Sequence, residues 1–338
     1  MRQRALSWLC ATTALLALLC SCSKSKSGGE SDNKSPAKTG SPEPAAAAAP
    51  AGGAIKLAVA AIPIVDVAPL YLGKAKGFFA EQNLDLTIQS VRGGAEAVPG
   101  VVSGQFQFAF ANVISLLLAH SKGLPLKVIA AGNFSTGKAE DFGGIVVPAG
   151  SAIKSMKDLE GKTVSVNQIN NIVGVGVRAS MRKAGGDPDK IKFIEVPFPE
   201  MPAALGQARV DAACIVEPFL TVARNQGATV LDWNFANTGP NLMIAGYFTT
   251  KDYAKSNPDV VARFTTAINK SLTYAAEHPD EARATLLTYT KIEKPIADKL
   301  NLPVWSPKIN RESIGLLADL MVQDKMMDAK PDIDALLQ

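Results

Sequence analysis

Short segments in which apolar and polar residues alternate are separated by segments in which apolar residues recur every three or four positions. The first two alternating segments are 55–60 and 84–91, and helical spacing follows at 69–79 and 95–102. Alternation is typical of a half-buried strand, and the longer period is typical of an amphipathic helix. Strands that alternate with helices predict an α/β protein, and about 285 residues remain after the N-terminal tail, enough for two lobes with substantial cores.

The segment 91–112 carries the first candidate binding feature. An alternating stretch turns through Gly93 and Gly94, continues as a short helix at 95–102 and returns as a strand at 106–110 that closes on Asn112. The first N–H groups of such a helix have no partner within it and suit an anionic or carbonyl-bearing ligand, which paired glycines allow to come close. An ordinary strand–helix turn explains two adjacent glycines as well, so both interpretations stay open at this point.

A second unit of the same plan lies at 195–219. A strand ends near Val196, a proline-rich turn follows, and a helix at 201–205 leads into a strand at 210–216. Ligands of open α/β sheets bind beyond the carboxyl ends of the strands. The repetition therefore predicts two similar lobes that face each other and hold a ligand between their strand ends.

Two extended apolar segments, 144–148 and 242–248, are expected to cross between the lobes as hinge strands. Lobe I is then 54–143 plus 249–338, and lobe II with the hinge strands is 144–248. The helices predicted after residue 258 are apolar on one face and charged on the other, so we expect them to complete the surface of lobe I.

Polar side chains gather where predicted strands end. Four amide side chains lie within 167–171, directly after the strand 163–167. An asparagine at a helix start is first of all a cap, but four amides exceed what capping requires, so this loop is also a ligand candidate. Glu217 follows the buried strand and precedes Pro218, where it either contacts a ligand or serves as a favourable charge at the start of the next helix.

The N-terminal 53 residues differ in character from the remainder. Arg2 and Arg4 precede an apolar run too short to span a bilayer, which predicts a secretory signal peptide at 1–22. The sequence Leu-Cys-Ser-Cys resembles a bacterial lipobox, with Cys22 as the lipidated residue. The segment 23–53 is rich in Ser, Lys, Gly, Pro and Ala, and it predicts a disordered tether. We therefore expect an extracytoplasmic protein anchored to the cell membrane by lipid.

Charge and reactive residues limit the functional classes. After residue 53 there are 29 basic and 28 acidic residues without a basic block, so nucleic-acid binding has little support. Cys214 lies alone in an apolar strand and is expected to be a buried small hydrophobe. His120 and His278 are far apart, with no metal-ligand spacing and no catalytic set beside a nucleophile. The sequence predicts neither an enzyme, nor a metal site, nor a cofactor.

Four ordered segments carry a family resemblance. They are APLYLGKAKGFFAEQNLDL (68–86), GGAEAVPGVVSGQFQFAFAN (93–112), VNQINN (166–171) and ARVDAACIVEPF (208–219). They resemble the nitrate/sulfonate/taurine and thiamine-precursor (NMT1/THI5-like) group of ABC-transporter substrate-binding proteins. The resemblance implies a bilobal fold of the periplasmic-binding-protein type II class, a monomer that closes on a small solute and delivers it to an ABC permease and its ATPase.

The resemblance also implies a set of ligand-binding residues from both lobes. In lobe I these are Asp66, Gly94, Ala95, Asn112 and Asn133, and in lobe II they are Asn170, Asn171 and Glu217. Arg92 and Arg178 are possible cleft arginines that no motif places. Without an assured arginine, the two carboxylates favour a small nitrogen- or sulfur-containing ligand that bears N–H or O–H donors, such as an aminopyrimidine or an amino-sulfonate.

Two alternatives remain at the level of sequence. A solute sensor that docks to a membrane receptor would have the same sequence features. The thiamine-precursor synthases that resemble this family are cytosolic enzymes with a cysteine-rich motif, whereas this chain has a secretory signal and one cysteine after residue 53.

Overall fold

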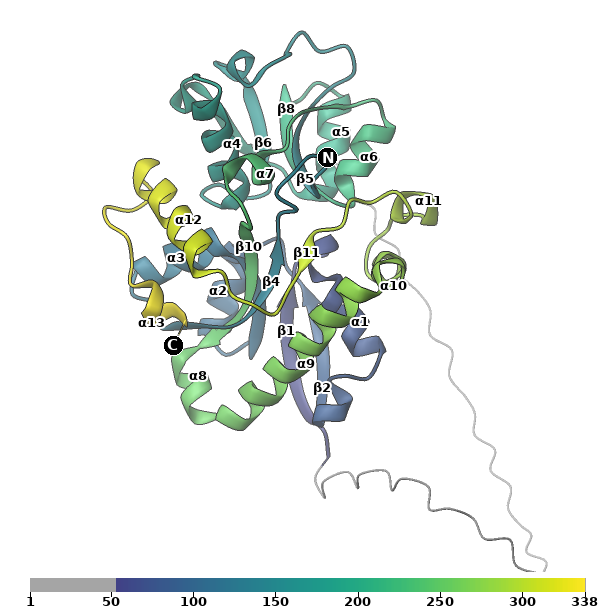
Figure 1. Ribbon diagram of the computed structural model, residues 1–338, viewed down its shortest axis with the longest axis vertical. Coiled ribbons are helices and arrows are strands. Elements are labelled where there is room, and N and C mark those ends of the chain that lie inside the picture. The colour runs from purple at the N-terminus through teal and green to yellow at the C-terminus, as the bar shows by residue number, and fades with distance from the viewer. Residues whose placement is uncertain (1–52, 338) are drawn as a thin grey trace, which may run out of the picture. The chain divides into compact units, whose positions relative to one another are not determined.

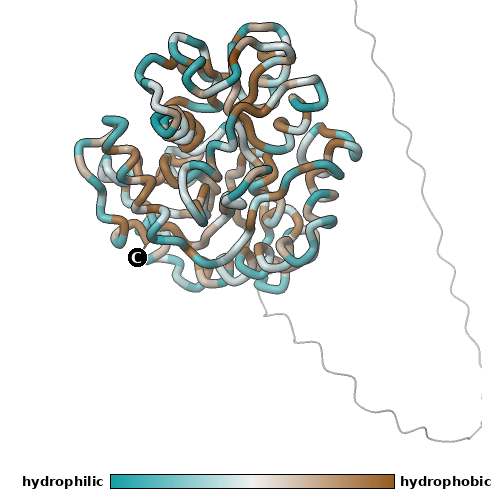
Figure 2. The backbone as a smooth tube through the Cα atoms, turned by 45° about the horizontal axis from the view of Figure 1, so that its top comes forward, coloured by the Kyte–Doolittle hydropathy of each residue, from teal (hydrophilic) through white to brown (hydrophobic). Residues whose placement is uncertain are grey.

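The computed structural model describes residues 53–337, and these form two α/β lobes, each built on its own sheet (Figure 1). The predicted signal peptide, Cys22 and nearly all of the predicted tether lie outside the described residues. Apolar segments gather in the interior of each lobe, and polar segments lie mostly in the outer loops and turns (Figure 2).

Lobe I contains a six-stranded sheet in the order β11-β4-β10-β3-β1-β2. Strand β1 pairs in parallel with β2 and β3, while β10 runs antiparallel between β3 and β4. Parallel neighbours bring their carboxyl ends to one edge, which faces lobe II. The strands are β1 (Ile55–Ala61), β2 (Leu84–Ser90), β3 (Phe108–Asn112), β4 (Leu126–Phe134), β10 (Met243–Thr250) and β11 (Val304–Trp305).

Helices cover both faces of this sheet (Figure 1). Phe108 of β3 stacks on Phe264 of α9 with ring centroids 4.0 Å apart, and both side chains are fully buried. Gly73 lets α1 approach α9, because a Cβ there would come within 1.8 Å of the Ser271 hydroxyl. The helices are α1 (Ala68–Ala75), α2 (Gly94–Val102), α3 (Val113–Ser121), α8 (Lys251–Ser256), α9 (Pro258–Glu277), α10 (Pro279–Thr285), α11 (Lys294–Ala297), α12 (Arg311–Gln323) and α13 (Ile333–Leu337).

Lobe II contains a five-stranded sheet in the order β7-β6-β8-β5-β9. The centre β6-β8 is parallel, and β5 runs antiparallel between β8 and β9. Its strands are β5 (Gly143–Val147), β6 (Thr163–Val166), β7 (Lys192–Glu195), β8 (Ala212–Val216) and β9 (Thr229–Asp232). Its helices are α4 (Ile172–Lys183), α5 (Met201–Gly206), α6 (Phe219–Asn225) and α7 (Asn234–Thr238).

The chain passes between the sheets at two places that differ from the predicted crossing strands. Strand β5 belongs wholly to the sheet of lobe II, so the first passage is the preceding segment 135–142. Strand β10 belongs wholly to the sheet of lobe I, so the second passage ends at residue 242 rather than 248. Both strands are almost entirely buried, and an apolar run that is buried on both faces does not reveal from sequence which sheet it joins.

Single-turn 3₁₀ segments help to join these elements. The one that matters for the site is η1 (Val65–Val67), which leads from β1 into α1. Within residues 53–337, none of the helices has both the length and the apolar character needed to cross a membrane.

Candidate ligand-binding site

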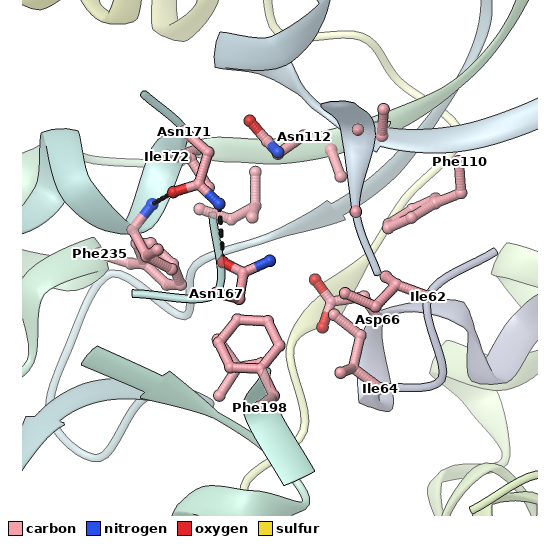
Figure 3. Close-up of a pocket in the computed structure, with 17 residues that line it drawn as sticks. Ile62, Ile64, Asp66, Phe110, Asn112, Asn167, Asn171, Ile172, Phe198 and Phe235 are labelled. Carbon is pink, nitrogen blue, oxygen red and sulfur yellow. Dashed lines mark hydrogen bonds between the residues drawn. The ribbon is translucent and has the colours of Figure 1, made fainter. Parts of the chain in front are cut away.

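A cavity of about 430 Å³, including its opening, lies between the two lobes (Figure 3). Lobe I contributes Ile62, Ile64, Asp66, Gly93, Gly94, Phe110, Ala111, Asn112, Ile244 and Ala245, and lobe II contributes Asn167, Asn171, Ile172, Val173, Phe198, Val216 and Phe235.

Asp66 is the one ionisable side chain among these lining residues. It lies in η1 just beyond the carboxyl end of β1 and is 3% exposed. The Asn133 side chain donates a hydrogen bond of 2.9 Å to Asp66 Oδ1, and the Trp305 indole donates to the Asp66 carbonyl over 3.2 Å. Burial raises the pKa of Asp66 from 3.8 to about 7. Near neutral pH this carboxyl group is therefore available both with and without its proton.

Several polar atoms near Asp66 are buried without a hydrogen-bond partner. Among the described residues, Asp66 Oδ2, Asn133 Oδ1 and the Tyr247 hydroxyl are buried and have no hydrogen-bond partner. Burying such groups without a partner is unfavourable, so a bound donor or water would stabilise them. Asn133 itself does not line the cavity; it lies behind Asp66 and orients the carboxylate.

Lobe II faces Asp66 with two linked amides. The Asn171 side chain caps α4 by accepting from the N–H of Val173 at 3.2 Å, and it donates to Asn167 Oδ1 over 2.7 Å. Asn167 and Asp66 face one another across the cavity (Figure 3). Capping thus explains Asn171, while Asn167 extends the polar surface of the cavity toward lobe I.

Asn112 lies at the start of α3. Its oxygen accepts from the N–H of Ser115 and its amide group donates to the Ser115 hydroxyl, both over 3.0 Å. The side chain lines the cavity but already has these local partners, so it contributes a polar surface with limited spare hydrogen-bonding capacity.

Aromatic and branched apolar side chains form the remainder of the wall. Phe110 of lobe I and Phe198 and Phe235 of lobe II are each at most 5% exposed, and Ile62 and Ile64 lie on the lobe I side. A wall of this kind favours a ligand with an apolar or aromatic ring.

The lobes touch at the rim of the cavity. Gln168 Oε1 accepts from the Ala95 N–H over 3.2 Å, and Asn167 donates to the Arg92 carbonyl over 3.4 Å. Gly93 is required here, because its φ is +156° and a Cβ would come within 2.3 Å of Gln168 Oε1. The start of α2, predicted as a ligand site, therefore has two roles. Gly94 lines the cavity, and the N–H of Ala95 already donates to Gln168 of lobe II.

Glu217 has a different role from the predicted ligand contact. It is fully buried, outside the cavity, and its carboxylate accepts from the Thr221 N–H at 2.9 Å, the Thr221 hydroxyl at 2.8 Å and the Asn301 N–H at 3.2 Å. Burial raises its pKa to about 7. Because Asn301 comes from the C-terminal part of the chain that packs on lobe I, Glu217 links the lobes near the hinge, and the prediction of a ligand role is corrected.

The predicted ligand residue Asn170 and the two possible cleft arginines, Arg92 and Arg178, lie away from the central cavity. Asn170 has φ of +60° and lines a separate cavity on the flank of α4. Arg92 has an exposed side chain at the rim, 3.6 Å from Glu96, and Arg178 also lies on the flank of α4. None of the three lines the central cavity, so its described wall presents no guanidinium to an anion.

Sequence reasoning did not select Asn167 or Phe198 as site residues. Asn167 belongs to the amide-rich loop after β6, which the cluster of four amide side chains had already marked as a ligand candidate. Phe198 lies just past β7, in a segment expected to be only a proline-rich turn. The rule that ligands bind beyond the carboxyl ends of strands, applied to β7 as well, would have found it.

Two α/β lobes around an interlobe cavity are the architecture of periplasmic binding proteins. The alkanesulfonate-binding protein SsuA from Xanthomonas axonopodis pv. citri, solved bound to MOPS, has this fold with a TM-score of 0.71 at 17% sequence identity, covering 85% of this chain and 99% of that one. The family model described as NMT1/THI5 like matches residues 64–282, and the chain belongs to this family.

Two curated relatives differ in activity. A formylaminopyrimidine-binding protein of Halalkalibacterium halodurans is 26% identical over 257 residues, covering 75% of this chain and 73% of its own. A 4-amino-5-hydroxymethyl-2-methylpyrimidine phosphate synthase of Saccharomyces cerevisiae is 22% identical over 228 residues, covering 63% of this chain and 64% of its own. The chain thus has relatives named as a binding protein and as an enzyme.

Proposed function

We propose that this protein is the extracytoplasmic solute-binding component of an ABC importer, and that it captures a small nitrogen-bearing ring compound between its lobes. One observation carries the proposal: the interlobe cavity is lined mostly by apolar residues, and its single ionisable lining group, Asp66, has a buried oxygen without a partner.

The chemistry of the cavity favours a ligand that donates hydrogen bonds. A protonated Asp66 can donate one hydrogen bond and accept another, and an ionised Asp66 can only accept. An aminopyrimidine edge, with a ring nitrogen beside an N–H, matches the first form, and an ammonium group matches the second. A sulfonate or nitrate would find no cationic side chain among the described lining residues to strengthen its hydrogen bonds.

The proposed mechanism is closure by population shift. A ligand that contacts Asp66 in lobe I and Asn167 in lobe II binds both lobes only when they are closed, so it favours the closed form. The Gln168–Ala95 contact at the rim then screens the ligand from water. The permease and its ATPase are the proposed partners, because relatives of this fold include ligand-binding components of import systems.

An enzyme on the same fold is the less favoured alternative. The free cysteine in the described residues, Cys214, is 1% exposed inside β8, and burial raises the pKa of its thiol. Neither His120 nor His278 lines the cavity. A sensor that docks to a receptor is the other alternative, and co-purification of a receptor in place of a permease would favour it.

Lipid attachment at Cys22 is part of the proposal, although this residue lies outside the described part of the chain. It rests on the charged start, the short apolar run and the Leu-Cys-Ser-Cys sequence. Mass spectrometry of the membrane-extracted protein should give a mature chain that begins with a lipid-modified Cys22. An unlipidated chain beginning at or after Ser23 would refute the anchor and leave the solute-binding proposal in place.

The ligand class is tested by thermal unfolding against a panel of aminopyrimidines, flavin precursors, taurine, alkanesulfonates, nitrate and amino acids. A ligand at about a thousand times its Kd stabilises by roughly 4 kcal/mol, which for a chain of this size raises Tm by about 7 °C. We expect an aminopyrimidine to produce such a shift in the wild type and a smaller one in Asp66→Asn. Asp85→Asn, an exposed change on β2, is the matched control. A shift with sulfonates alone would refute the proposed ligand class.

A further inference from the structure

Helix α12 belongs to lobe I but reaches lobe II. It packs on α3 of lobe I and also contacts α4 of lobe II, beside which it lies in Figure 1. The Ser313 hydroxyl accepts from the N–H of Met243 over 3.1 Å, which fixes α12 to the start of β10, where the second passage between lobes ends. The start of α12 is thus held on lobe I.

Asp324, directly after α12, forms ion pairs across the lobe boundary. Arg178 Nε donates to Asp324 Oδ1 over 2.7 Å, and Arg182 Nη2 contacts the same oxygen. The Asp324 side chain is 1% exposed, while those of Arg178 and Arg182 are 20% and 22% exposed. Arg178 also pairs with Asp189 within lobe II, so its guanidinium is held in place from both sides.

Both arginines lie on α4, the helix whose first residues form part of the cavity wall. Ile172 and Val173 line the cavity, and Arg178 and Arg182 follow one and a half to three turns later. A helix of 12 residues is about 18 Å long and moves as a rigid rod. Holding its later turns against lobe I therefore also holds its first turn over the cavity.

We propose that Asp324 is a positioning residue that clamps α4 to lobe I through Arg178 and Arg182 and so keeps the lobes closed over the cavity. The inference rests on the proposed function, since closure matters only for a protein that retains a solute. It assigns to Arg178 a role in closure in place of the anion binding considered from sequence.

The ion pairs of this clamp can hold the two lobes together and still allow them to separate. Charged hydrogen bonds contribute more than neutral ones, and a buried carboxylate that loses its partners is strongly disfavoured. Among the described residues, however, Asp324 Oδ2 and Arg182 Nη1 are buried without a partner. Opening would expose both atoms to water, which offsets part of the lost ion pairing.

The test is hydrogen exchange, resolved to single residues, on the ligand-free full chain. The reporter is the amide of Ala95, whose backbone N–H donates across the rim to Gln168 of lobe II. The internal control is the amide of Ile169, which donates to Glu195 Oε1 over 2.7 Å within lobe II. In Asp324→Asn, we expect exchange at Ala95 to be about tenfold faster, because charged hydrogen bonds are lost, and exchange at Ile169 to be unchanged.

A control variant and a second variant that breaks the same interlobe ion pairs complete the experiment. Asp319→Asn in α12 removes an exposed pair with Lys330 inside lobe I and should leave Ala95 unchanged. The double change of Arg178 and Arg182 to Gln should accelerate Ala95 as Asp324→Asn does. Unchanged exchange at Ala95 in both clamp variants, or equal acceleration at Ile169, would overturn the proposal. Because no ligand is added, these outcomes are independent of the solute panel.

Discussion

The burial of Asp66 predicts how strongly the stability of the protein depends on pH. Its pKa rises from 3.8 to about 7 in the folded protein, so between these values the folded state holds a proton that the unfolded state has released. The free energy of unfolding therefore falls as pH rises through this window. A shift of about three pH units corresponds to about 4 kcal/mol. Asn at this position cannot titrate and retains an acceptor for Asn133.

The measurement is chemical unfolding of wild type and Asp66→Asn between pH 4 and pH 8. We expect the two proteins to have similar stability at pH 4 and the variant to gain up to about 4 kcal/mol over wild type by pH 8. The difference between the proteins removes the contribution of Glu217, whose raised pKa is common to both. Asp85→Asn should show no such trend. If wild type and Asp66→Asn differed in stability by the same amount at every pH, this would refute the conclusion that burial, with no cation nearby, raises the pKa of Asp66.

The remaining predictions concern packing and the hinge. Gly73→Ala should destabilise the protein by about 1–3 kcal/mol in chemical unfolding, because the new Cβ would overlap Ser271. Gly315→Ala in α12 should stabilise it by about 0.5–1 kcal/mol, because nothing lies within 4 Å of the added Cβ and alanine favours the helix. Equal changes in stability in these two variants would contradict the described packing of α1 on α9. Thr221→Val removes the hydroxyl donor to Glu217 and should lower stability by about 1–3 kcal/mol while leaving affinity for an aminopyrimidine unchanged. A large loss of affinity would return Glu217 to the ligand site.

Local sequence patterns were sufficient for most elements and for part of the site. The glycine turn and its helix, and the amide loop with a capping asparagine, follow from periodicity and capping, whereas Asp66 was expected from the family resemblance. These features depend on residues close together in sequence, which is why they could be predicted.

Features that depend on distant pairing could not be predicted in the same way. The position of Glu217 at a strand end was correct, but the direction of its side chain is set by Thr221 and by Asn301, which is 84 residues away. Asp324 lies directly after α12, and its arginine partners are more than 140 residues earlier in the chain. Which lobe receives β10 is likewise decided by its fit between β3 and β4.

The place of β10 in the sheet of lobe I sets an order for folding during synthesis. All strands of lobe II lie within residues 143–232, so this lobe can form once that single stretch has emerged. The sheet of lobe I needs residues 243–250 to join β3 to β4, and until then it exists as two separate pieces. The N-terminal strands, though made first, must wait for a distant partner, and such non-local pairing is slow. The lobe whose first strands are made earliest is therefore the last to complete its sheet.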